Sequence, residues 1–205
     1  MIAVAGDGVD PAAVALTMID PGQSVILDDS TTGLHLAEHL AERQPITVIT
    51  NFQPVMDLVV KQPELALLAL GGQYYPWCRA YMGSVTLGAL RNLRADMFFM
   101  STSAVTDSIC FHQHHDTVLV KRAMFESART RIAYIDHTKF EQRALHALGP
   151  LNEFDAVIVD ARTAEEHIQS LQRDGANVIV APDPPATPEP RTSQTGRGRD
   201  EKMRT

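Results

Sequence analysis

The stretch SVILDDSTTGLHLAEHLAER, residues 24–43, carries the alternation that decides the fold. Its first five residues, 24–28, form a short apolar run of the kind found in strands buried within a sheet. A polar loop follows at 29–33. Apolar residues then recur at helical spacing over 34–43, at Leu34, Ala37, Leu40 and Ala41. The stretch therefore predicts a strand, a loop and a helix in direct succession.

The same alternation extends to both sides of this stretch. Further apolar runs of strand type lie at 46–50, 65–70, 96–101, 131–136, 156–160 and 177–181. Helices are expected at 12–19, 54–61, 84–92, 118–127 and 164–173. Continuous apolar strands separated by helices predict an α/β fold, in which a mostly parallel sheet of about seven strands has helices on both faces.

The composition is that of an ordinary globular protein, with 44% hydrophobic and 21% charged residues in a chain of 205. No run approaches the roughly 18 apolar residues that span a bilayer, and the first residues lack the basic flank of a signal peptide. We therefore expect a cytoplasmic protein without a membrane partner. Cys78 and Cys110 lie far apart and outside any CxxC spacing, which predicts two free thiols.

Charge and composition divide the chain into three expected parts. These are an N-terminal stub of an interdomain linker at 1–9, one domain at 10–181, and a disordered, proline-rich tail at 182–205. The formal charge of −7 is not that of a nucleic-acid binder. A small phosphate can still bind, because it responds to local donors more than to net charge.

Small polar residues, glycines and one lysine follow five of the expected strands. Because parallel strands end at one edge of an open α/β sheet, where ligands of such folds bind, these residues are candidates for a single site. In chain order they are Asp29, Ser30, Thr31, Thr32 and Gly33; Thr50 and Asn51; Gly71 and Gly72; Ser101, Thr102 and Ser103; and Asp136, His137, Thr138 and Lys139.

Two of these groups have a ligand interpretation and a plainer one. Three hydroxyls beside the amides that open a helix suit a phosphate, but Ser30 or Thr31 can equally well cap the helix. Asp136 and Lys139 can orient hydroxyls and neutralise a phosphate, or can form a surface ion pair of little energetic weight.

The glycine pair, Lys121 and a histidine cluster also leave alternatives open. Gly71 and Gly72 either let the backbone approach a ligand or turn the chain. Lys121 is either a ligand residue or a solvated lysine. The run 112–115, HQHH, does not have the spacing of a zinc site, so we expect a polar loop near the ligand and no metal. The chain also shows no nucleophile motif, Walker loop or GxGxxG, so no catalytic residue or cofactor is expected.

Taken in order, several motifs resemble the C-terminal sensor domain of DeoR-type transcriptional regulators. They are ILDDSTTGLHLAEHL, VITN, LLALGGQ, Gly83, ADMFFMSTSAV, VKRAMFESA, IDHTKF and FDAVIVD, spread over roughly residues 12–181. The resemblance implies a fold similar to ribose-5-phosphate isomerase and glucosamine-6-phosphate deaminase. It also implies a phosphorylated sugar or related small anionic metabolite as the ligand, and a homodimer or homotetramer.

The resemblance also implies roles for individual residues. The loop after the first strand would hold the phosphate, and further family elements would complete the site. The corresponding residues here are Asp29, Ser30, Thr31, Thr32 and Gly33 for the phosphate loop, and Thr50, Asn51, Gly71, Gly72, Lys121, Asp136, Thr138 and Lys139 for the other elements.

This chain departs from the family pattern in two places. Such regulators usually carry an N-terminal winged helix-turn-helix of about fifty residues, whereas only a short stub precedes Asp10. We therefore expect DNA contact only through a helix-turn-helix domain absent from this chain. The loop after 96–101 usually carries a glycine pair, but here it reads STSAVTDSICFHQHH, without glycine.

Two rival functions follow from the same residues. A sugar-phosphate isomerase or deaminase needs a carboxylate base beside the substrate, yet 101–106 holds no acid and the first one is Asp107. An oligomerisation module with a vestigial pocket would bind no phosphate at all. We expect a sensor and not an enzyme.

Overall fold

The computed structural model describes residues 11–182 of the chain. The expected linker stub at 1–9 lies outside the described residues, as does the expected tail except for its first residue. None of the helices in the described range has the length and apolar character needed to span a bilayer. Cys78 and Cys110 are both free, as predicted.

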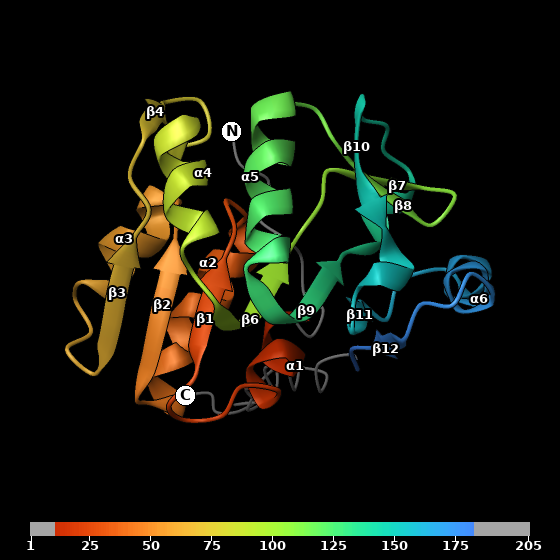
Figure 1. Cartoon of the computed structure of the whole chain (residues 1–205). Coiled ribbons are helices and arrows are strands. Elements are labelled where there is room, and N and C mark those ends of the chain that lie inside the picture. The colour runs from red at the N-terminus through yellow and green to blue at the C-terminus, as the bar shows by residue number, and fades with distance from the viewer. Residues whose placement is uncertain (1–10, 183–205) are drawn as a thin grey trace, which may run out of the picture.

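A seven-stranded sheet forms the centre of the fold, with the order β12-β11-β9-β6-β1-β2-β3 (Figure 1). Every neighbouring pair of strands in it runs parallel. The expected parallel sheet is confirmed, with small shifts at the strand ends. The bounds are β1 (Ser24–Leu27), β2 (Ile46–Thr50), β3 (Leu65–Ala69), β6 (Ala95–Met100), β9 (Ala128–Ile135), β11 (Ala156–Val159) and β12 (Val178–Val180).

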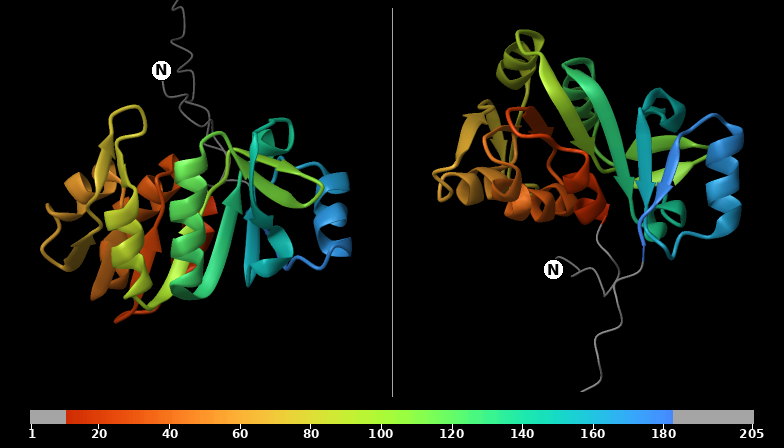
Figure 2. Two further views of the ribbon diagram at one scale, coloured as in Figure 1. Left: turned by 45° about the horizontal axis from the view of Figure 1, so that its top comes forward. Right: turned by 90° about the horizontal axis from the view of Figure 1, so that it is seen from below.

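Helices cover both faces of this sheet, as predicted (Figure 2). On one face α1 (Pro11–Thr17), α2 (Thr31–His39) and α3 (Gln53–Val59) contact each other in chain order. On the other face α4 (Ser84–Arg91) packs against α5 (His115–Glu126), while α6 (Glu165–Arg173) lies beside β12. The central strands β1 and β6 are buried between the two layers, and their apolar side chains are fully enclosed.

Five short strands and two short 3-10 helices surround the main sheet and were not expected from the sequence. Strands of three to five residues are too short for a clear period of two. The hairpin of β4 (Gln73–Tyr75) and β5 (Ala80–Met82) follows β3. A second antiparallel sheet contains β7 (Ala104–Thr106), β8 (Ile109–His112) and β10 (His146–Pro150), and the 3-10 helices are η2 (His137–Phe140) and η3 (Leu151–Glu153).

Two helices begin earlier than their apolar spacing indicates. The expected start of α2 at Leu34 is wrong: the helix begins at Thr31, ends at His39 and continues as the 3-10 turn η1 (Leu40–Arg43). The expected start of α5 at Val118 is also wrong, because that helix begins at His115. Apolar spacing marks the turns of a helix that bury apolar side chains, whereas the first turns of α2 and α5 carry polar residues and glycine, including the buried Gly33 and Thr117. The predicted phosphate loop at 29–33 is therefore partly the first turn of α2.

Candidate functional site

A buried ion pair between Asp28 and Lys121 lies beneath the loop that follows β1. The Lys121 ammonium lies 2.6 Å from Asp28 Oδ2, donates to the Ser101 carbonyl at 2.9 Å, and is 3.4 Å from Asp29 Oδ1. The exposed fractions of the side chains are 3% for Lys121 and 0% for Asp28. The solvated alternative for Lys121 is thereby corrected, because the side chain is buried and its three donors are directed at acceptors of the protein itself.

Burial and charge act in opposite directions on this pair. Burial lowers the pKa of Lys121, but the Asp28 and Asp29 carboxylates outweigh burial and raise it above the ordinary value. Burial raises the pKa of Asp28, and the Lys121 ammonium opposes that rise. Lys121 therefore stays protonated, and its ammonium lies between the carboxyl groups of Asp28 and Asp29 at the base of the loop.

Ser30 caps helix α2, so the plainer interpretation holds for this residue. Its Oγ accepts a hydrogen bond from the Gly33 amide at 3.0 Å and donates to Asp28 Oδ1 at 2.5 Å. The Leu34 amide donates to the Ser30 carbonyl at 3.1 Å. The amides of Thr31 and Thr32 lie in the first turn, where backbone amides have no partner inside the helix, and they remain available. Thr31 is exposed and Thr32 is half-exposed.

Tyr134 contacts this loop, although it belongs to β9, which lies two strands away from β1. Its hydroxyl is 3.4 Å from Ser30 Oγ. A Cβ added to Gly33 would lie 2.9 Å from that hydroxyl and 3.1 Å from Ser30 Oγ. Glycine at position 33 is thus required by close packing, and the phosphate loop expected from the sequence is held in place by residues that the sequence did not indicate.

Asn51 follows β2, the strand paired with β1, and is 1% exposed. Its Nδ2 donates to the Tyr81 carbonyl at 2.9 Å, while Oδ1 is a buried acceptor without a partner among the described residues. Thr50 Oγ1 accepts from the Phe52 amide at 3.1 Å. Of these two predicted residues, Thr50 therefore shapes the turn, and Asn51 retains a free acceptor.

The glycine pair after β3 turns the chain. Gly72 has a φ of +149°, and a Cβ there would lie 2.3 Å from Thr86 Oγ1 and 2.6 Å from the Met82 carbonyl oxygen. A Cβ on Gly71 would meet nothing within 4 Å. Gly72 is explained by packing against the start of α4, and neither glycine needs a ligand to account for it.

Asp136 and Lys139 form the ion pair that the plainer interpretation describes. Asp136 caps η2 by accepting from the amide and the hydroxyl of Thr138, and its other oxygen lies 3.4 Å from Lys139 Nζ. The two side chains are 37% and 28% exposed. They follow β9, which β6 separates from β1, so they share the sheet edge with Ser30 without contacting it in the structure.

A histidine cluster and the β4–β5 hairpin meet near the N-terminus of α5. The Trp77 and His114 rings lie 4.0 Å apart between centroids, and the Tyr75 hydroxyl donates to Asp116 Oδ2 at 2.9 Å. Burial, assisted by the nearby Lys121 charge, lowers the pKa of His112 to about 4. Among residues 11–182 no group of three histidines, cysteines or acids is placed to hold a metal ion.

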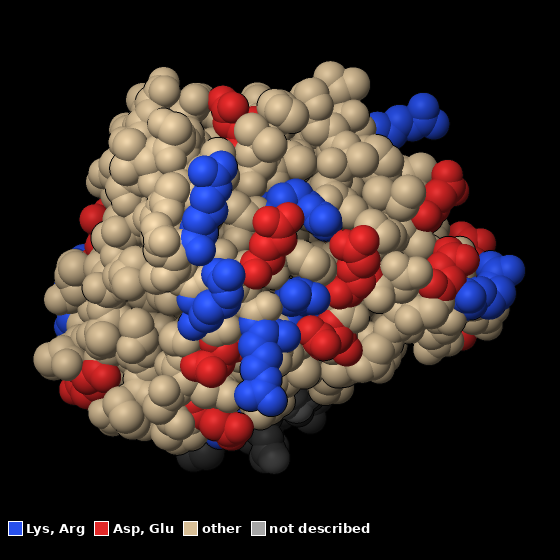
Figure 3. Space-filling view, viewed as in Figure 1, with Lys and Arg blue, Asp and Glu red and all other residues tan. Residues whose placement is uncertain are grey.

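Two hollows lie away from the predicted residues. One, of about 690 Å³, is lined by the β7–β8 hairpin, the segment after η2, and α6, and it includes Asp107. The candidate base of the isomerase alternative is therefore at a hairpin tip and not beside Asp28. A groove of about 350 Å³ runs between α4 and α5. Basic and acidic side chains interleave over that face, which gathers no continuous positive surface (Figure 3).

The ends of β1, β2, β3, β6 and β9 lie along one edge of the sheet, and the predicted site residues follow them there. Asp28 and Tyr134 are the residues that sequence reasoning missed. The acidic doublet at 28–29, directly after an apolar strand, could have drawn attention to Asp28. Tyr134 gives no such signal, because it stands inside an apolar strand.

The chain matches the model of a known protein family. The model of the DeoR C terminal sensor domain matches residues 11–161. Among curated proteins, the HTH-type transcriptional regulator YgbI of Escherichia coli (strain K12) is 30% identical over 168 residues, covering 82% of this chain and 66% of that protein. The HTH-type transcriptional repressor GlcR of Bacillus subtilis (strain 168) is 29% identical over 167 residues, covering 82% and 64%.

A lactose phosphotransferase system repressor of Lactococcus lactis subsp. lactis is 28% identical over 168 residues, covering 80% of this chain and 66% of that protein. The chain thus spans slightly less than two thirds of the length of these relatives. Among solved structures, eIF2B delta from Chaetomium thermophilum has a TM-score of 0.52 at 13% identity, covering 72% of this chain and 53% of that one. Ribose 5-phosphate isomerase A from Methanocaldococcus jannaschii has a TM-score of 0.46 at 14% identity, covering 64% and 52%. The likeness to eIF2B delta is a likeness of fold alone.

Proposed function

The chain belongs to the family of DeoR C-terminal sensor domains, and on that premise we propose that it binds a phosphorylated sugar or a related small anionic metabolite at the edge of the sheet where β1 and β2 end. Binding there would modulate transcription by the regulator that contains the domain. The chain is the sensing domain of a DeoR-type regulator. We propose in addition the class of ligand, the effect of that ligand on transcription and a cytoplasmic location.

The start of α2 is the proposed phosphate position. A helix N-terminus combines unpaired amides with roughly half a positive charge, which suits a phosphate group. The amides of Thr31 and Thr32 are not used by the Ser30 cap, and the hydroxyls of both residues stand beside them. Gly33 keeps this turn free of a side chain.

Asn51 is the proposed acceptor for a sugar hydroxyl. A buried amide oxygen without a partner costs free energy unless a ligand or water supplies a donor. Thr50, just before it, pairs in register with Leu27 at the end of β1, so the Asn51 turn and the Thr31 turn begin side by side. The free amides that open α2 and the free buried acceptor after β2 follow two neighbouring strand ends, and this is the observation that carries the proposal.

The roles of the charged residues differ from those that the resemblance alone implies. Lys121 holds Asp28, and in this proposal it acts as a positioning residue for the loop instead of contacting the ligand. The negative charge of Asp29 favours ligand hydroxyls over phosphate oxygens at that position. Lys139 is the cation left for the phosphate. It is half-exposed and follows β9, a strand that lies two positions, roughly 10 Å, from β1 in the sheet.

A sensor of this kind works by differential affinity. A ligand shifts an equilibrium between two states only as far as it prefers one of them. We infer a non-catalytic role, because the candidate base Asp107 lies in the other hollow. DNA contact through a helix-turn-helix domain, and assembly as a homodimer or homotetramer, remain predictions for the whole regulator.

Isothermal titration calorimetry tests the proposal. The probes are ribose 5-phosphate, fructose 6-phosphate, glucosamine 6-phosphate and inorganic phosphate. We expect Thr31→Ala and Lys139→Ala each to weaken binding of the preferred sugar phosphate by about 10- to 100-fold, since each removes a hydrogen bond to a charged group worth roughly 1.5–3 kcal/mol.

Matched controls lie at the opposite edge of the sheet. Thr130→Ala alters a threonine in the first half of β9, and Lys61→Ala alters an exposed lysine between α3 and β3. Neither should change the affinity. Absence of binding by all four probes, or equal affinity of Thr31→Ala, Lys139→Ala and the unaltered protein, would falsify the proposed site.

A further inference from the structure

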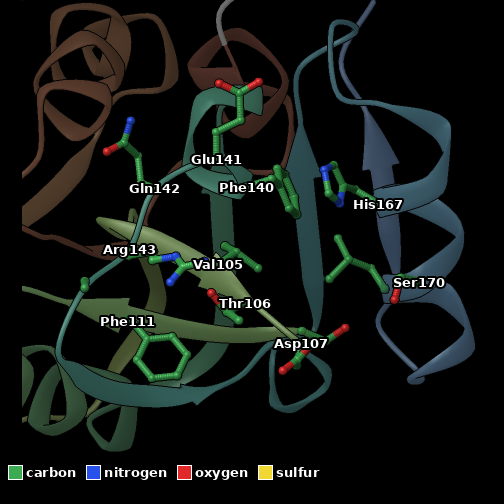
Figure 4. A pocket seen from close by; sticks show the side chains of 13 residues that line it. Val105, Thr106, Asp107, Phe111, Phe140, Glu141, Gln142, Arg143, His167 and Ser170 are labelled. Atoms are coloured by element: carbon green, nitrogen blue, oxygen red, sulfur yellow. The ribbon is translucent and has the colours of Figure 1, made fainter.

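A cavity lies beside Phe140, the last residue of η2. It has a volume of about 690 Å³, within the roughly 300–1,000 Å³ typical of small-molecule sites. Three segments distant in sequence enclose it: the β7–β8 hairpin, the coil that follows η2, and α6 (Figure 4). None of its lining residues belongs to the predicted sugar-phosphate site.

Hydrogen bonds at two points hold the walls of this cavity in place. At the tip of the β7–β8 hairpin, Ser108 Oγ donates to Asp174 Oδ2 at 2.5 Å, just after α6. On the other side, Gln113 Nε2 donates to the Arg143 carbonyl at 2.8 Å. The cavity therefore does not depend on a ligand to bring its walls together.

The interior has an aromatic and aliphatic wall. Phe140 and His167 stack with ring centroids 4.6 Å apart and an angle of 13° between the ring planes. Phe111, Val105 and Leu171 add apolar surface. Such a wall favours a ligand that carries an apolar side chain or a ring.

Two opposite charges line the rim of the same cavity, where both side chains are exposed to solvent. Neither the Arg143 guanidinium nor the Asp107 carboxylate has a hydrogen bond or an ion pair with a residue in the range 11–182. In Figure 4 the Arg143 side chain points toward Val105 and Thr106, while Asp107 lies beyond Thr106 on the opposite side. Glu141, the other acid of the lining, points away from these side chains. The cavity thus offers one cation and one anion to an occupant.

We propose that this cavity binds a free amino acid with an apolar side chain. The carboxylate of the amino acid would pair with Arg143, whose planar guanidinium suits a carboxylate. Its ammonium would pair with Asp107, and its side chain would pack against Phe111 and Phe140. An anion without an ammonium group would leave Asp107 unpaired, and a purely cationic ligand would leave Arg143 unpaired.

Calorimetry with four related probes tests the assignment on the full chain. L-Phenylalanine carries both charges, L-leucine replaces its ring by an aliphatic group, phenyllactate lacks the ammonium, and phenethylamine lacks the carboxylate. We expect the two amino acids to bind at least about tenfold more tightly than either singly charged probe, because each lost charge-assisted bond weakens binding by about that factor or more.

Two variants test whether Arg143 pairs with the carboxylate of the amino acid and Asp107 with its ammonium group. Arg143→Gln should weaken L-phenylalanine binding about tenfold or more and leave phenethylamine unchanged. Asp107→Asn should weaken L-phenylalanine by a similar factor and leave phenyllactate unchanged. Asparagine is the suitable substitution at 107, because Asp107 has a φ of +49° and asparagine tolerates that conformation. Arg91→Gln, at an exposed arginine of the α4–α5 groove, is the matched control and should bind like the unaltered protein.

The proposal fails if no amino acid binds at millimolar concentration, if phenyllactate binds as tightly as L-phenylalanine, or if both variants bind L-phenylalanine normally. These outcomes are independent of the sugar-phosphate proposal, because Thr31→Ala alters only the other site.

Discussion

Lys121 shows how one buried cation organises the loops around it. Its ammonium joins Asp28 after β1, Asp29 beside it and the Ser101 carbonyl after β6. Asp28 in turn accepts from the Ser101 amide at 2.8 Å and from Ser30. The loops after β1 and β6 are thus connected through a single buried network.

Lys121→Met should lower the free energy of unfolding by about 3–5 kcal/mol, because it leaves a buried carboxylate uncompensated. The double variant Lys121→Met/Asp28→Asn should recover part of that loss, since the uncompensated charge is removed as well. Urea denaturation of the single variants and the double variant measures the coupling. Losses that simply add would show that the two side chains do not act as a pair.

His112 makes stability depend on pH. Its pKa is lowered to about 4 by burial and by Lys121, and its Nδ1 accepts from the His114 amide at 3.2 Å. Unfolding restores a pKa near 6.5. Below that pH the unfolded chain binds a proton that the folded chain does not, so the contribution is fully present above pH 6.5 and declines as the pH falls toward 4.

Between pH 7 and pH 5 the unaltered protein should therefore lose on the order of 1–2 kcal/mol more stability than His112→Gln. Urea denaturation of both proteins at the two pH values makes the comparison. The remaining histidines are common to both and cancel. Equal losses would mean that His112 titrates normally in the folded protein.

At the scale of elements, the turn between β3 and β4 contains one glycine that is closely packed and one that is not. Gly72 faces Thr86 and the Met82 carbonyl at distances that no Cβ tolerates, whereas Gly71 faces open space and Thr86 Oγ1 donates to its carbonyl at 2.7 Å. The two glycines are adjacent and both exposed, so they form a matched pair for substitution.

Gly72→Ala should destabilise the protein by about 2 kcal/mol or more, because alanine is strained at a φ of +149° and the Met82 backbone cannot move away cheaply. Gly71→Ala should change stability by less than about 0.5 kcal/mol. Thermal denaturation of both variants is sufficient. A large effect at Gly71 instead would contradict the packing described here.

At the scale of the whole molecule, the β4–β5 hairpin bridges two distant parts of the fold. On one side the Tyr81 amide donates to the Asn51 carbonyl at 2.9 Å. On the other side Tyr75 and Trp77 contact the N-terminal end of α5 at Asp116 and His114. The hairpin is therefore attached both to the turn after β2 and to the start of α5.

Because of these two attachments, the hairpin should unfold together with the main sheet. Trp77 is the only tryptophan of the chain, so its fluorescence reports on the hairpin, whereas far-UV circular dichroism reports on all helices and strands. In urea the two transitions should coincide. In the Tyr75→Phe/His114→Ala variant the fluorescence transition should move to lower urea. Separate transitions in the unaltered protein would show that the hairpin is an independent unit.

The amino-acid pattern alone was enough to establish the parallel sheet, its seven strands and the edge where polar residues gather. Buried parallel strands need continuous apolar runs such as 46–50, and helices between them force all strand ends to one side. The residues that follow each strand, and so lie at that edge, can be read directly from the sequence. The resemblance to DeoR-type sensor domains rested on the same ordered segments.

Roles of individual side chains depended on contacts that no local pattern encodes. Lys121 meets Asp28 across 93 positions, and Tyr134 reaches Ser30 across 104. Whether a lysine is solvated or buried is decided by what packs against it. Similarly, the cavity between β7, β8 and α6 exists only because strands too short to show a period pair with one another. Periodicity reports which face of an element is buried, and only three-dimensional packing determines which groups meet there.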